Sequence, residues 1–440
     1  MLSRAVWELG FLRAGARRYW SELEGFGAKP PAEARREMGR RLLEQVRYFG
    51  TRADALPEWR EAARLRDPEA LWAVWDSLPI LTKHDLQTRF HPREMVPRFG
   101  LVGRASSTGG STGEPTPFFH TPEVLAAMTA ARHYTRRQMG WIPGRPLVIV
   151  WGSERDIGRT RSNRARVSAR MRNEWLVDGY SLDGHTVDRV LGLLRRLGPV
   201  ALYGFTSMLE FVARETLKRG DLPAPGSVRA AWNGGEMLYD SQSELFCRAF
   251  GVPILNFYGG RELSAMAYQR APGAPLRVVR PWLHVDVVDD LGRPVPPGQA
   301  GRLIWTSTLC RGTPFLRYDV GDLGSWSPAG RDESGIRELA SLQGRFAGLV
   351  RLPGGKTING LYWNHLFKEF PEVEQFQVAV LGNRGLEFRL RGGPLTAERE
   401  DELRARAGNI VGHTPVTLRW MEKIPLSPQG KLMQVVHEAE

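Results

Sequence analysis

Four short apolar runs alternate with helical segments between residues 146 and 258, and this alternation limits the fold more than any other feature of the sequence. The runs are PLVIVW at 146–151, PVALYGF at 199–205, SVRAAWN at 227–233 and VPILNFY at 252–258. Near-continuous apolar runs of this length are typical of strands buried on both faces. Strands that alternate with helices form a sheet that helices cover. The sequence therefore predicts an α/β fold.

The rest of the chain predicts a two-domain organisation. Helical periodicity dominates the first 90 residues, which we expect to wrap around the main domain. From about residue 283 two antiparallel strands flank a Gly/Pro-rich turn. Beyond Gly344 we expect a hairpin, a helix at 363–370, two strands, a second helix and a last strand at 416–424. The prediction is a large α/β domain at 1–344, with a β-rich portion, and a small mobile α+β domain at 345–440.

The charge of the chain does not by itself indicate a nucleic-acid partner. The 61 Lys and Arg residues exceed the 48 Asp and Glu residues, which gives a net charge of +13. Most basic residues are scattered, and no nucleic-acid-binding signature is present, so we expect no such partner. The one dense run, ERDIGRTRSNRARVSARMR at 154–172, fits a solvated segment, a phosphate-binding lid or a surface for an acidic partner.

Cysteine usage and the N-terminus favour a cytoplasmic location. Cys247 and Cys310 are too few for a disulfide framework and lack metal-ligand spacing, which suits a reducing compartment. Glu8 and Arg13 interrupt the first apolar residues before a secretory core or a membrane span could form. We therefore expect no integral membrane segment.

The stretch SSTGGSTGEPTP at 106–117 combines glycines with hydroxyl groups but contains no lysine or arginine. Backbone N–H groups freed by glycine, together with Ser and Thr hydroxyls, form a donor-rich concavity that suits phosphate oxygens. The same residues also fit a polar surface loop. The stretch lacks the G-x-x-x-x-G-K-[ST] pattern, and at GGKT (354–357) Val350 stands where that pattern needs glycine. Thr121 and Pro122 then predict the start of a helix.

Further motifs follow strands or lie at the domain junction. NGGE at 233–236 and FYGGRE at 257–262 come at strand ends, where open α/β sheets bind ligands. Each of these motifs in isolation also fits an ordinary turn. Three later segments are RYDVGD at 317–322, LQGR at 342–345 and IPLSPQGK at 424–431.

Taken in order, these segments resemble the AMP-forming adenylate-forming superfamily of acyl-CoA synthetases, over nearly the whole chain. Within it the sequence looks most similar to the phenylacetate-CoA ligase family, especially a branch associated with capsular polysaccharide biosynthesis. The segments LPILTKHDLQ, TGGSTGEPT and WNHLFKEFPEVEQFQV carry this similarity. The resemblance implies a ligase that uses ATP and Mg²⁺ to convert a carboxylic acid to an acyl-adenylate. The acyl group then passes to CoA as co-substrate, or to an amine or hydroxyl acceptor.

The resemblance also implies roles for individual residues. Asp322 would accept both ribose hydroxyls, and Glu262 would hold Mg²⁺. Lys431 would supply the catalytic cation that the loop lacks, when the C-terminal domain closes over ATP and the acid. The ATP phosphates would contact Thr108, Gly110, Ser111, Thr112 and Gly113. The other nucleotide-binding residues would be Gly235, Glu236, Tyr258, Gly259 and Arg345. The acyl pocket would draw on Tyr203, Gly204 and Phe205, which equally fit a hydrophobic core.

The sequence departs from the family pattern at two places. Gly109 replaces the first loop serine, and Ala347 and Gly348 stand where the family has an acidic pair whose first member marks the domain hinge. An alternative therefore stays open, in which the protein is a catalytically degenerate nucleotide-binding scaffold whose basic surface contacts a membrane or an acidic polymer. No short motif indicates the acid, the acceptor or the oligomeric state.

Overall fold

The computed structural model divides the chain into two compact units, Met1–Val320 with Gly324–Leu342, and Gly321–Leu323 with Gln343–Glu440. The structure describes residues 2–13, 15–52, 54–108, 115–151, 163–179, 183–331, 337–345, 349–351, 357–359, 363, 366–367, 369–381, 385–425 and 432–438.

Helices occupy most of residues 2–98, as the periodicity predicts. Proline lies in the first turn of α3, α4, α5 and α7, where its fixed φ suits a helix start. A capping box begins α6, because the Thr82 hydroxyl accepts from the Asp85 N–H at 3.3 Å and the Asp85 carboxylate accepts from the Thr82 N–H at 2.7 Å. The elements are α1 (Leu2–Arg13), α2 (Ala16–Gly27), α3 (Pro31–Gly50), α4 (Pro57–Ala62), α5 (Pro68–Val74), η1 (Trp75–Ser77), α6 (Lys83–Gln87) and α7 (Pro92–Arg98).

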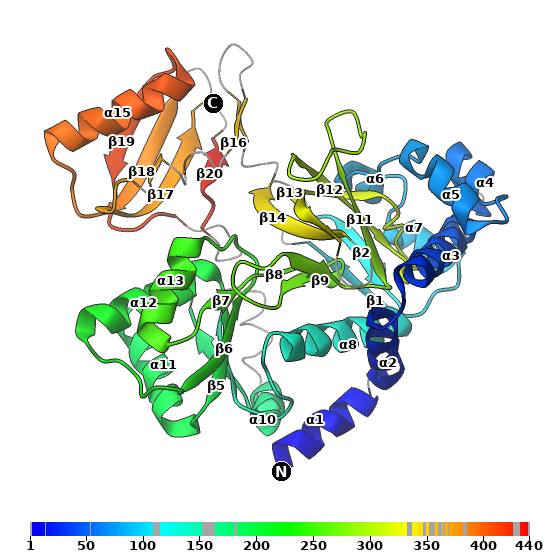
Figure 1. The fold of residues 1–440 in the computed structure, drawn as a ribbon, viewed down its shortest axis with the longest axis horizontal. Coiled ribbons are helices and arrows are strands. Elements are labelled where there is room, and N and C mark those ends of the chain that lie inside the picture. The colour runs from blue at the N-terminus through cyan, green and yellow to red at the C-terminus, as the bar shows by residue number, and fades with distance from the viewer. Residues whose placement is uncertain are drawn as a thin grey trace. The chain divides into compact units, whose positions relative to one another are not determined.

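A parallel five-stranded sheet confirms the predicted α/β fold (Figure 1). Its strand order is β4-β3-β5-β6-β7, and buried Val148, Leu202 and Ala231 share one core with the helices that pack against it. The strands are β3 (Leu147–Trp151), β4 (Glu174–Asp178), β5 (Val200–Gly204), β6 (Val228–Asn233) and β7 (Ile254–Leu255). The helices are α10 (Asn163–Met171), α11 (Gly184–Leu197), α12 (Thr206–Arg219) and α13 (Asp240–Phe250).

The run at 252–258 was expected to be one strand, and this expectation is wrong. The chain changes sheets at Asn256, so that β7 ends the parallel sheet while the next strand, β8, begins a different one. Asn256 lies between the two strands, and its N–H donates to the Gln269 side chain at 3.0 Å. The predicted pair of antiparallel strands after residue 283 is confirmed, with Leu283 opposite Ser307.

The second sheet of this unit has seven strands in the order β11-β12-β13-β14-β10-β9-β8. A separate hairpin, formed by β1 and β2, flanks residues 109–114 in sequence, and α8 follows it. Thr121 occupies the N-cap of α8 and Pro122 its first turn, as predicted. The elements are β1 (Arg104–Ser107), β2 (Pro117–His120), α8 (Pro122–Gln138), β8 (Phe257–Gly260), β9 (Ser264–Gln269), β10 (Leu276–Val278), β11 (Leu283–Val288), β12 (Ala300–Ser307), β13 (Tyr318–Arg331) and β14 (Arg337–Arg345).

The smaller unit has a four-stranded sheet in the order β19-β18-β17-β20, beside which α15 packs through Leu403 and Ala407. The strand at 416–424 is not the last one, because three further residues pair with β17 as β20. In the helix expected at 363–370, the described residues Trp363, Leu366 and Phe367 are helical, and residues 364–365 and 368 lie outside the described part of the chain. The elements are β15 (Leu349–Arg351), β16 (Thr357–Asn359), β17 (Val373–Val380), β18 (Leu386–Gly392), α15 (Ala397–Val411), β19 (Val416–Trp420) and β20 (Val435–His437).

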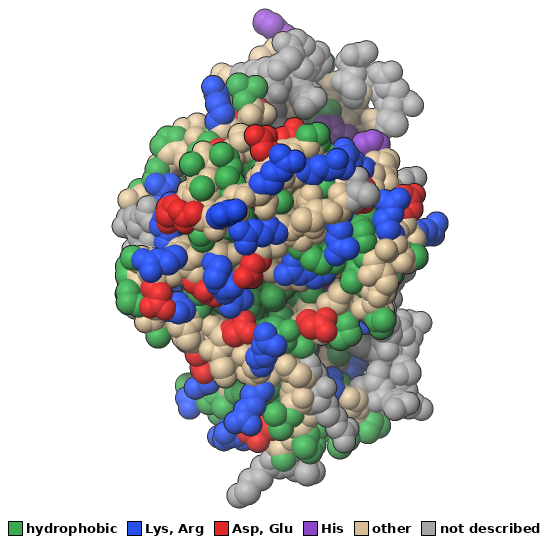
Figure 2. All heavy atoms as spheres, turned by 90° about the vertical axis from the view of Figure 1, so that its right-hand side faces the viewer, with side chains coloured by type: hydrophobic (Ala, Val, Ile, Leu, Met, Phe, Trp, Pro, Cys, Tyr) green, Lys and Arg blue, Asp and Glu red, His purple; other side chains and the backbone are tan. Residues whose placement is uncertain are grey.

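On the face shown in Figure 2, Lys and Arg side chains alternate with Asp and Glu side chains. Ion pairs of this kind occur along α3, where Glu37 pairs with Arg40 at 2.8 Å and with Arg41 at 2.7 Å. The positive charge of the chain therefore does not form a continuous basic surface over the visible part of this face. Among the described residues, no helix combines the length and the hydropathy that crossing a bilayer requires.

Candidate functional site

The buried amide of Asn233 joins three segments at the carboxyl edge of the parallel sheet. Its Nδ2 donates to the Thr206 hydroxyl at 3.0 Å and to the Glu236 carbonyl oxygen at 2.9 Å, and its Oδ1 accepts from the Phe257 N–H at 2.8 Å. These partners belong to the start of α12, the turn after β6 and the start of β8. One side chain therefore fixes the predicted NGGE and FYGG motifs next to each other.

The Glu236 carboxylate supports the same edge by binding the first turn of α12. It accepts from the Ser207 N–H at 2.7 Å and from the Ser207 hydroxyl at 3.0 Å. A carboxylate at a helix N-terminus satisfies an N–H group without an intrahelical partner and complements the helix dipole. The preceding Gly235 has a φ of 73°, a conformation that glycine adopts without strain. Glu236 thus stabilises the turn that carries Gly235.

Aromatic rings line the ends of the same strands. The Tyr203 ring stacks on Trp232 at a centroid distance of 5.9 Å and on Trp151 at 5.3 Å, and Trp151 stacks on Phe205 at 4.0 Å. Phe205 is only 1% exposed and belongs to the core of the parallel sheet, whereas Tyr203 is half-buried. Of the two interpretations, the core one describes Phe205 best, whereas Tyr203 and Trp151 are both half-buried at this edge.

Two glycines allow this close packing. A Cβ on Gly234 would lie 2.6 Å from the Tyr203 hydroxyl, and one on Gly204 would lie 2.7 Å from the Val150 carbonyl oxygen. Both distances are shorter than any van der Waals contact, so a side chain at either position would displace the aromatic residue or the neighbouring strand. Gly204 is therefore required for strand packing, and it presents no side chain to a pocket.

Arg136, which the sequence analysis did not predict as part of the site, lies near the Tyr203 ring. Its guanidinium carbon is 5.8 Å from the centre of the Tyr203 ring, and its Nη1 is 3.5 Å from a Glu174 carboxylate oxygen. Burial lowers the pKa of Arg136, and the Glu174 carboxylate opposes that shift. No local sequence signal identifies this residue, because it lies on an ordinary turn of α8 and its partners come from distant segments.

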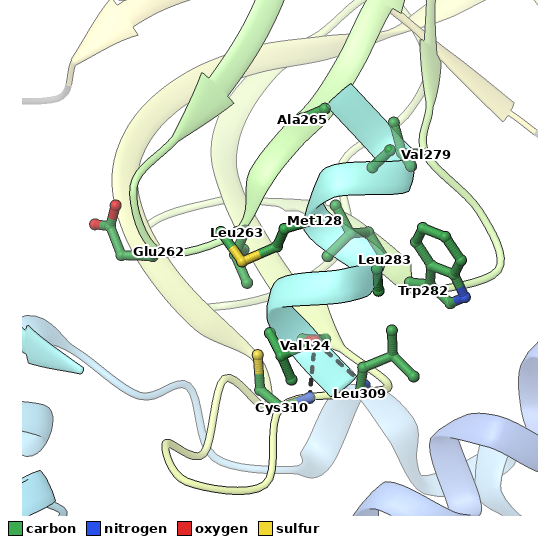
Figure 3. A pocket seen from close by; sticks show the side chains of 13 residues that line it. Val124, Met128, Glu262, Leu263, Ala265, Val279, Trp282, Leu283, Leu309 and Cys310 are labelled. Carbon is green, nitrogen blue, oxygen red and sulfur yellow. Dashed lines mark hydrogen bonds between the residues drawn. The ribbon is translucent and has the colours of Figure 1, made fainter. Parts of the chain in front are cut away.

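The strand β8 carries Tyr258 and Gly259, and the turn after it carries Glu262. The Tyr258 ring packs on Trp305 at a centroid distance of 5.7 Å. A Cβ on Gly259 would lie 2.4 Å from the Ser264 carbonyl oxygen, so only glycine fits this hairpin without displacement. Glu262 is half-buried, and Figure 3 shows its carboxylate pointing away from the apolar side chains around it.

The apolar side chains behind Glu262 surround a cavity of about 30 Å³ between α8 and the antiparallel sheet (Figure 3). This volume holds about one water molecule, too little for an acyl chain or a nucleotide. Burial raises the pKa of the Cys310 thiol, which borders the cavity, to about 12, so this thiol is not a nucleophile near neutral pH. The cavity is also lined by Val124, Met128, Leu263, Trp282 and Leu309.

A hydrogen bond joins the Glu262 turn to the hairpin that precedes α8. The Nε2 atom of His120, the last residue of β2, lies 2.7 Å from the Glu262 carbonyl oxygen. His120 is only 3% exposed, and burial lowers the pKa of its imidazole. Sequence reasoning missed this residue, whose partner is 142 positions away.

The base of the Ser/Thr/Gly stretch is closed by Thr108. Its N–H donates to the Thr116 carbonyl oxygen at 2.9 Å, and its hydroxyl accepts from the Thr116 N–H at 2.9 Å. The predicted phosphate-binding residues Gly110, Ser111, Thr112 and Gly113 lie outside the described residues.

The RYDVGD segment pairs with the early LPILTKHDLQ segment. The Leu81 N–H donates to the Arg317 carbonyl oxygen at 2.9 Å, and the Asp319 N–H donates to the Leu81 carbonyl oxygen at 2.8 Å. The Asp319 carboxylate accepts a hydrogen bond from the Arg302 side chain at 2.8 Å, so this ion pair joins β13 to β12. Asp322 is half-buried and lies farther along β13.

Two predicted site residues remain without a described side chain. Arg345 is the last residue of β14, and its side chain is outside the described part of the structure. Lys431 lies entirely outside the described residues.

The described residues contain no group of three or more His, Cys, Asp or Glu side chains that could hold a metal ion. Magnesium in phosphate-transferring sites is commonly held by one or two carboxylates together with substrate phosphates. The Glu262 carboxylate, directed away from the apolar cavity, fits that kind of site. It does not fit a cage made of protein ligands alone.

Comparison with known proteins identifies relatives in sequence. A family model described as AMP-binding enzyme matches residues 176–310. Phenylacetate-coenzyme A ligase of Thermus thermophilus is 26% identical over 275 residues, which cover 58% of this chain and 58% of that protein. Protein CapK of Staphylococcus aureus is 23% identical over 248 residues, covering 56% of this chain and 53% of CapK. The chain thus spans somewhat more than half the length of these two relatives.

Solved structures show the same fold at low sequence identity. A 2-hydroxyisobutyryl-CoA ligase in the postadenylation state, in complex with an acyl-AMP, has a TM-score of 0.68 and 17% identity over 93% of this chain and 90% of that one. An anthranilate CoA ligase in complex with anthranoyl-AMP has a TM-score of 0.55 and 15% identity over 74% of this chain and 64% of that one. These matches agree with the predicted resemblance: part of the chain matches the AMP-binding enzyme family model, its sequence is similar to phenylacetate-coenzyme A ligase and to protein CapK, and it has the fold of adenylate-forming ligases.

Proposed function

We propose that the protein is an ATP-dependent, AMP-forming ligase that activates a carboxylic acid as an acyl-adenylate and transfers the acyl group to an acceptor. The observation that carries this proposal is the Asn233 junction, which holds the NGGE and FYGG motifs together at the carboxyl edge of a parallel sheet. Ligands of open α/β sheets bind at this edge. The similarity to AMP-binding enzymes supports a nucleotide as that ligand.

In this proposal the nucleotide lies against the backbone of Gly235 and Gly259 and beside Tyr258. Asp322 accepts the ribose hydroxyls, because an ionised carboxylate offers two acceptor oxygens. Arg345 provides a positive charge near the phosphates. The phosphate oxygens contact Thr108, Gly110, Ser111, Thr112 and Gly113.

The first half-reaction needs positioning and electrostatic stabilisation more than proton transfer. A carboxylic acid is ionised near neutral pH, so its oxygen can attack the α-phosphorus of ATP without a general base. The new P–O bond replaces the bond to pyrophosphate. Glu262 would hold Mg²⁺, which neutralises phosphate charge. Lys431 would place a compact ammonium charge near the acid and the α-phosphate.

The acyl pocket and the acceptor belong to the same proposal. Tyr203 is half-buried at the sheet edge, where it stacks on the half-buried Trp151, so we place the acyl group beside Tyr203, with Gly204 and Phe205 shaping the wall behind. In the second half-reaction the CoA thiol, or an amine or hydroxyl, attacks the acyl carbon, and AMP is released. The relatives named as CoA ligases favour CoA. A cytoplasmic location would supply both ATP and CoA.

A second candidate function is a nucleotide-binding scaffold without turnover. Ala347 and Gly348, in place of the acidic pair of the resembled family, favour it. In that case the arginine-rich run at 154–172 would bind a membrane surface or an acidic polymer.

A pyrophosphate-release screen separates the two functions. The full chain would be incubated with ATP, Mg²⁺ and aryl, fatty or amino acids, each with and without CoA, and Glu262→Gln would serve as the control. The ligase predicts release that depends on one class of acid and on Glu262. Calorimetric ATP binding without release for any acid would favour the scaffold, and absence of ATP binding would contradict both.

A further inference from the structure

We propose that His120 is a positioning residue for the metal-binding carboxylate of this site, because its ring N–H fixes the Glu262 backbone relative to the hairpin that flanks the Ser/Thr/Gly stretch. This inference rests on the proposed function, in which Glu262 holds Mg²⁺. His120 touches neither the metal nor the nucleotide in this account and acts only through Glu262.

The direction of the hydrogen bond follows from its partner. A carbonyl oxygen can only accept, so the His120 Nε2, 2.7 Å from the Glu262 oxygen, must carry the proton. The bond is buried, because the His120 side chain is 3% exposed.

The hairpin end of this bond is anchored independently of Glu262. His120 lies opposite Arg104 in the β1–β2 pairing, and its neighbour Phe119 donates its N–H to the Thr313 hydroxyl at 2.8 Å. Thr313 is fully buried. The position of His120 is therefore fixed by two contacts that would survive its substitution.

The Glu262 end is anchored on its other side by α8. Leu263 is 6% exposed and packs with Val124 and Met128 around the small cavity of Figure 3. Ser264 has a φ of 63°, which marks a sharp reversal of the chain directly after this residue pair. Glu262 thus lies in a tight turn, held by Leu263 on one side and by His120 on the other.

Metal binding is the property most sensitive to this arrangement. Mg²⁺ requires near-ideal octahedral geometry with oxygen ligands at about 2.0–2.1 Å, so a carboxylate displaced by a fraction of an ångström binds it poorly. The described residues offer no alternative cluster of acids that could replace Glu262. Loss of the His120 bond should therefore weaken metal binding more than it weakens folding or metal-free nucleotide binding.

The test uses Mn²⁺ as the metal probe and α,β-methylene-ATP as the nucleotide, so that no acid substrate is needed. Electron paramagnetic resonance would follow Mn²⁺ binding to the full chain. His120→Phe keeps an aromatic ring without a donor, and His120→Asn shortens the donor. Both should raise the Mn²⁺ concentration at half-saturation about tenfold, the effect of about 1.4 kcal/mol. His120→Gln carries an N–H at the end of a longer side chain and should stay within about threefold of the wild type.

Thr313→Val is the matched control, because it removes one of the two contacts that anchor the hairpin, while the β1–β2 pairing of His120 and the His120–Glu262 bond remain. It should lower the melting temperature while changing Mn²⁺ half-saturation by less than about twofold. Nucleotide affinity in EDTA, measured by calorimetry, should be the same for every variant.

Each contrary result has a distinct meaning. Unchanged Mn²⁺ binding by folded His120→Phe or His120→Asn, with impaired binding by Glu262→Gln, would overturn the role of His120 alone. An equal shift in Thr313→Val would attribute the effect to general loosening and would also overturn it. Wild-type Mn²⁺ binding by Glu262→Gln would instead refute the metal assignment within the proposed function, and the role of His120 with it.

Discussion

Substitution of Asn233 by alanine tests whether the buried amide at the sheet edge holds the site together. The change removes three hydrogen bonds of 2.8–3.0 Å, to Thr206, Glu236 and Phe257. A typical intramolecular hydrogen bond contributes about 0.5–1.5 kcal/mol, so three amount to about 1.5–4.5 kcal/mol. Domains are stable by only about 5–15 kcal/mol, which makes this a large but survivable loss.

The expected functional effect follows from the same contacts. Without Asn233 the NGGE turn and the start of β8 lose their connection, so ATP affinity should fall together with stability. Ser243→Ala is the matched control, because the Ser243 hydroxyl makes two 3.1 Å bonds to Ile254 away from the motifs. It should lower stability by about 1–3 kcal/mol and leave ATP affinity unchanged.

Urea unfolding followed by tryptophan fluorescence would give the stability changes, and calorimetry would give ATP affinities. An Asn233→Ala protein with wild-type stability would refute the energetic estimate. A destabilised but folded variant with wild-type ATP affinity would show that nucleotide binding does not depend on this junction, which would remove the main structural support for the proposed function.

Three further predictions concern other residues. Asp322→Ala should weaken ATP binding by about 1.5–3 kcal/mol for each lost bond to a charged group, and unchanged affinity by calorimetry would exclude it from the ribose site. Lys431→Ala should lower acyl-adenylate formation ~100- to 1000-fold, as for loss of one electrostatic donor, with ATP affinity nearly intact; wild-type rates in single-turnover assays would exclude it as the catalytic cation. Burial raises the pKa of Asp286, but His284, which lies 2.9 Å away, Arg317 and Trp75 outweigh burial, so that the pKa is lowered overall. Its contribution to stability is therefore present near neutral pH and lost as the pH falls below about 4, so the stability difference between wild type and Asp286→Asn should shrink there; a constant difference in urea midpoints would contradict this.

The sequence predicted the parts of the fold that repeat a pattern. The runs that became β3, β5 and β6 are nearly continuous in apolar residues, with Arg229 and Asn233 as the polar members of β6. Strand β4 escaped prediction because EWLVD begins and ends with an acidic residue, so that its apolar run has only three residues. Strand β20 has three residues, too few for any periodicity to appear.

The site was predictable only as far as motifs could indicate it. NGGE was correctly expected at the end of a strand, because the end of β6 can be recognised from the sequence, whereas FYGG forms strand β8 of the other sheet. The residues that hold this edge together were not predictable. His120 and Asn233 act through partners that are 142 and 24 positions away, and local patterns do not encode such distances.

Transfer of oxygen from the acid to AMP tests the central claim most directly. An acid substrate found in the screen would be labelled with ¹⁸O in its carboxylate and incubated with the protein, ATP, Mg²⁺ and acceptor, and the AMP would be analysed by mass spectrometry. If the carboxylate attacks the α-phosphorus, the bridging oxygen leaves with AMP when the acceptor takes the acyl group. The account predicts AMP that carries one ¹⁸O for each acyl group transferred. Unlabelled AMP, or formation of ADP in its place, would contradict it.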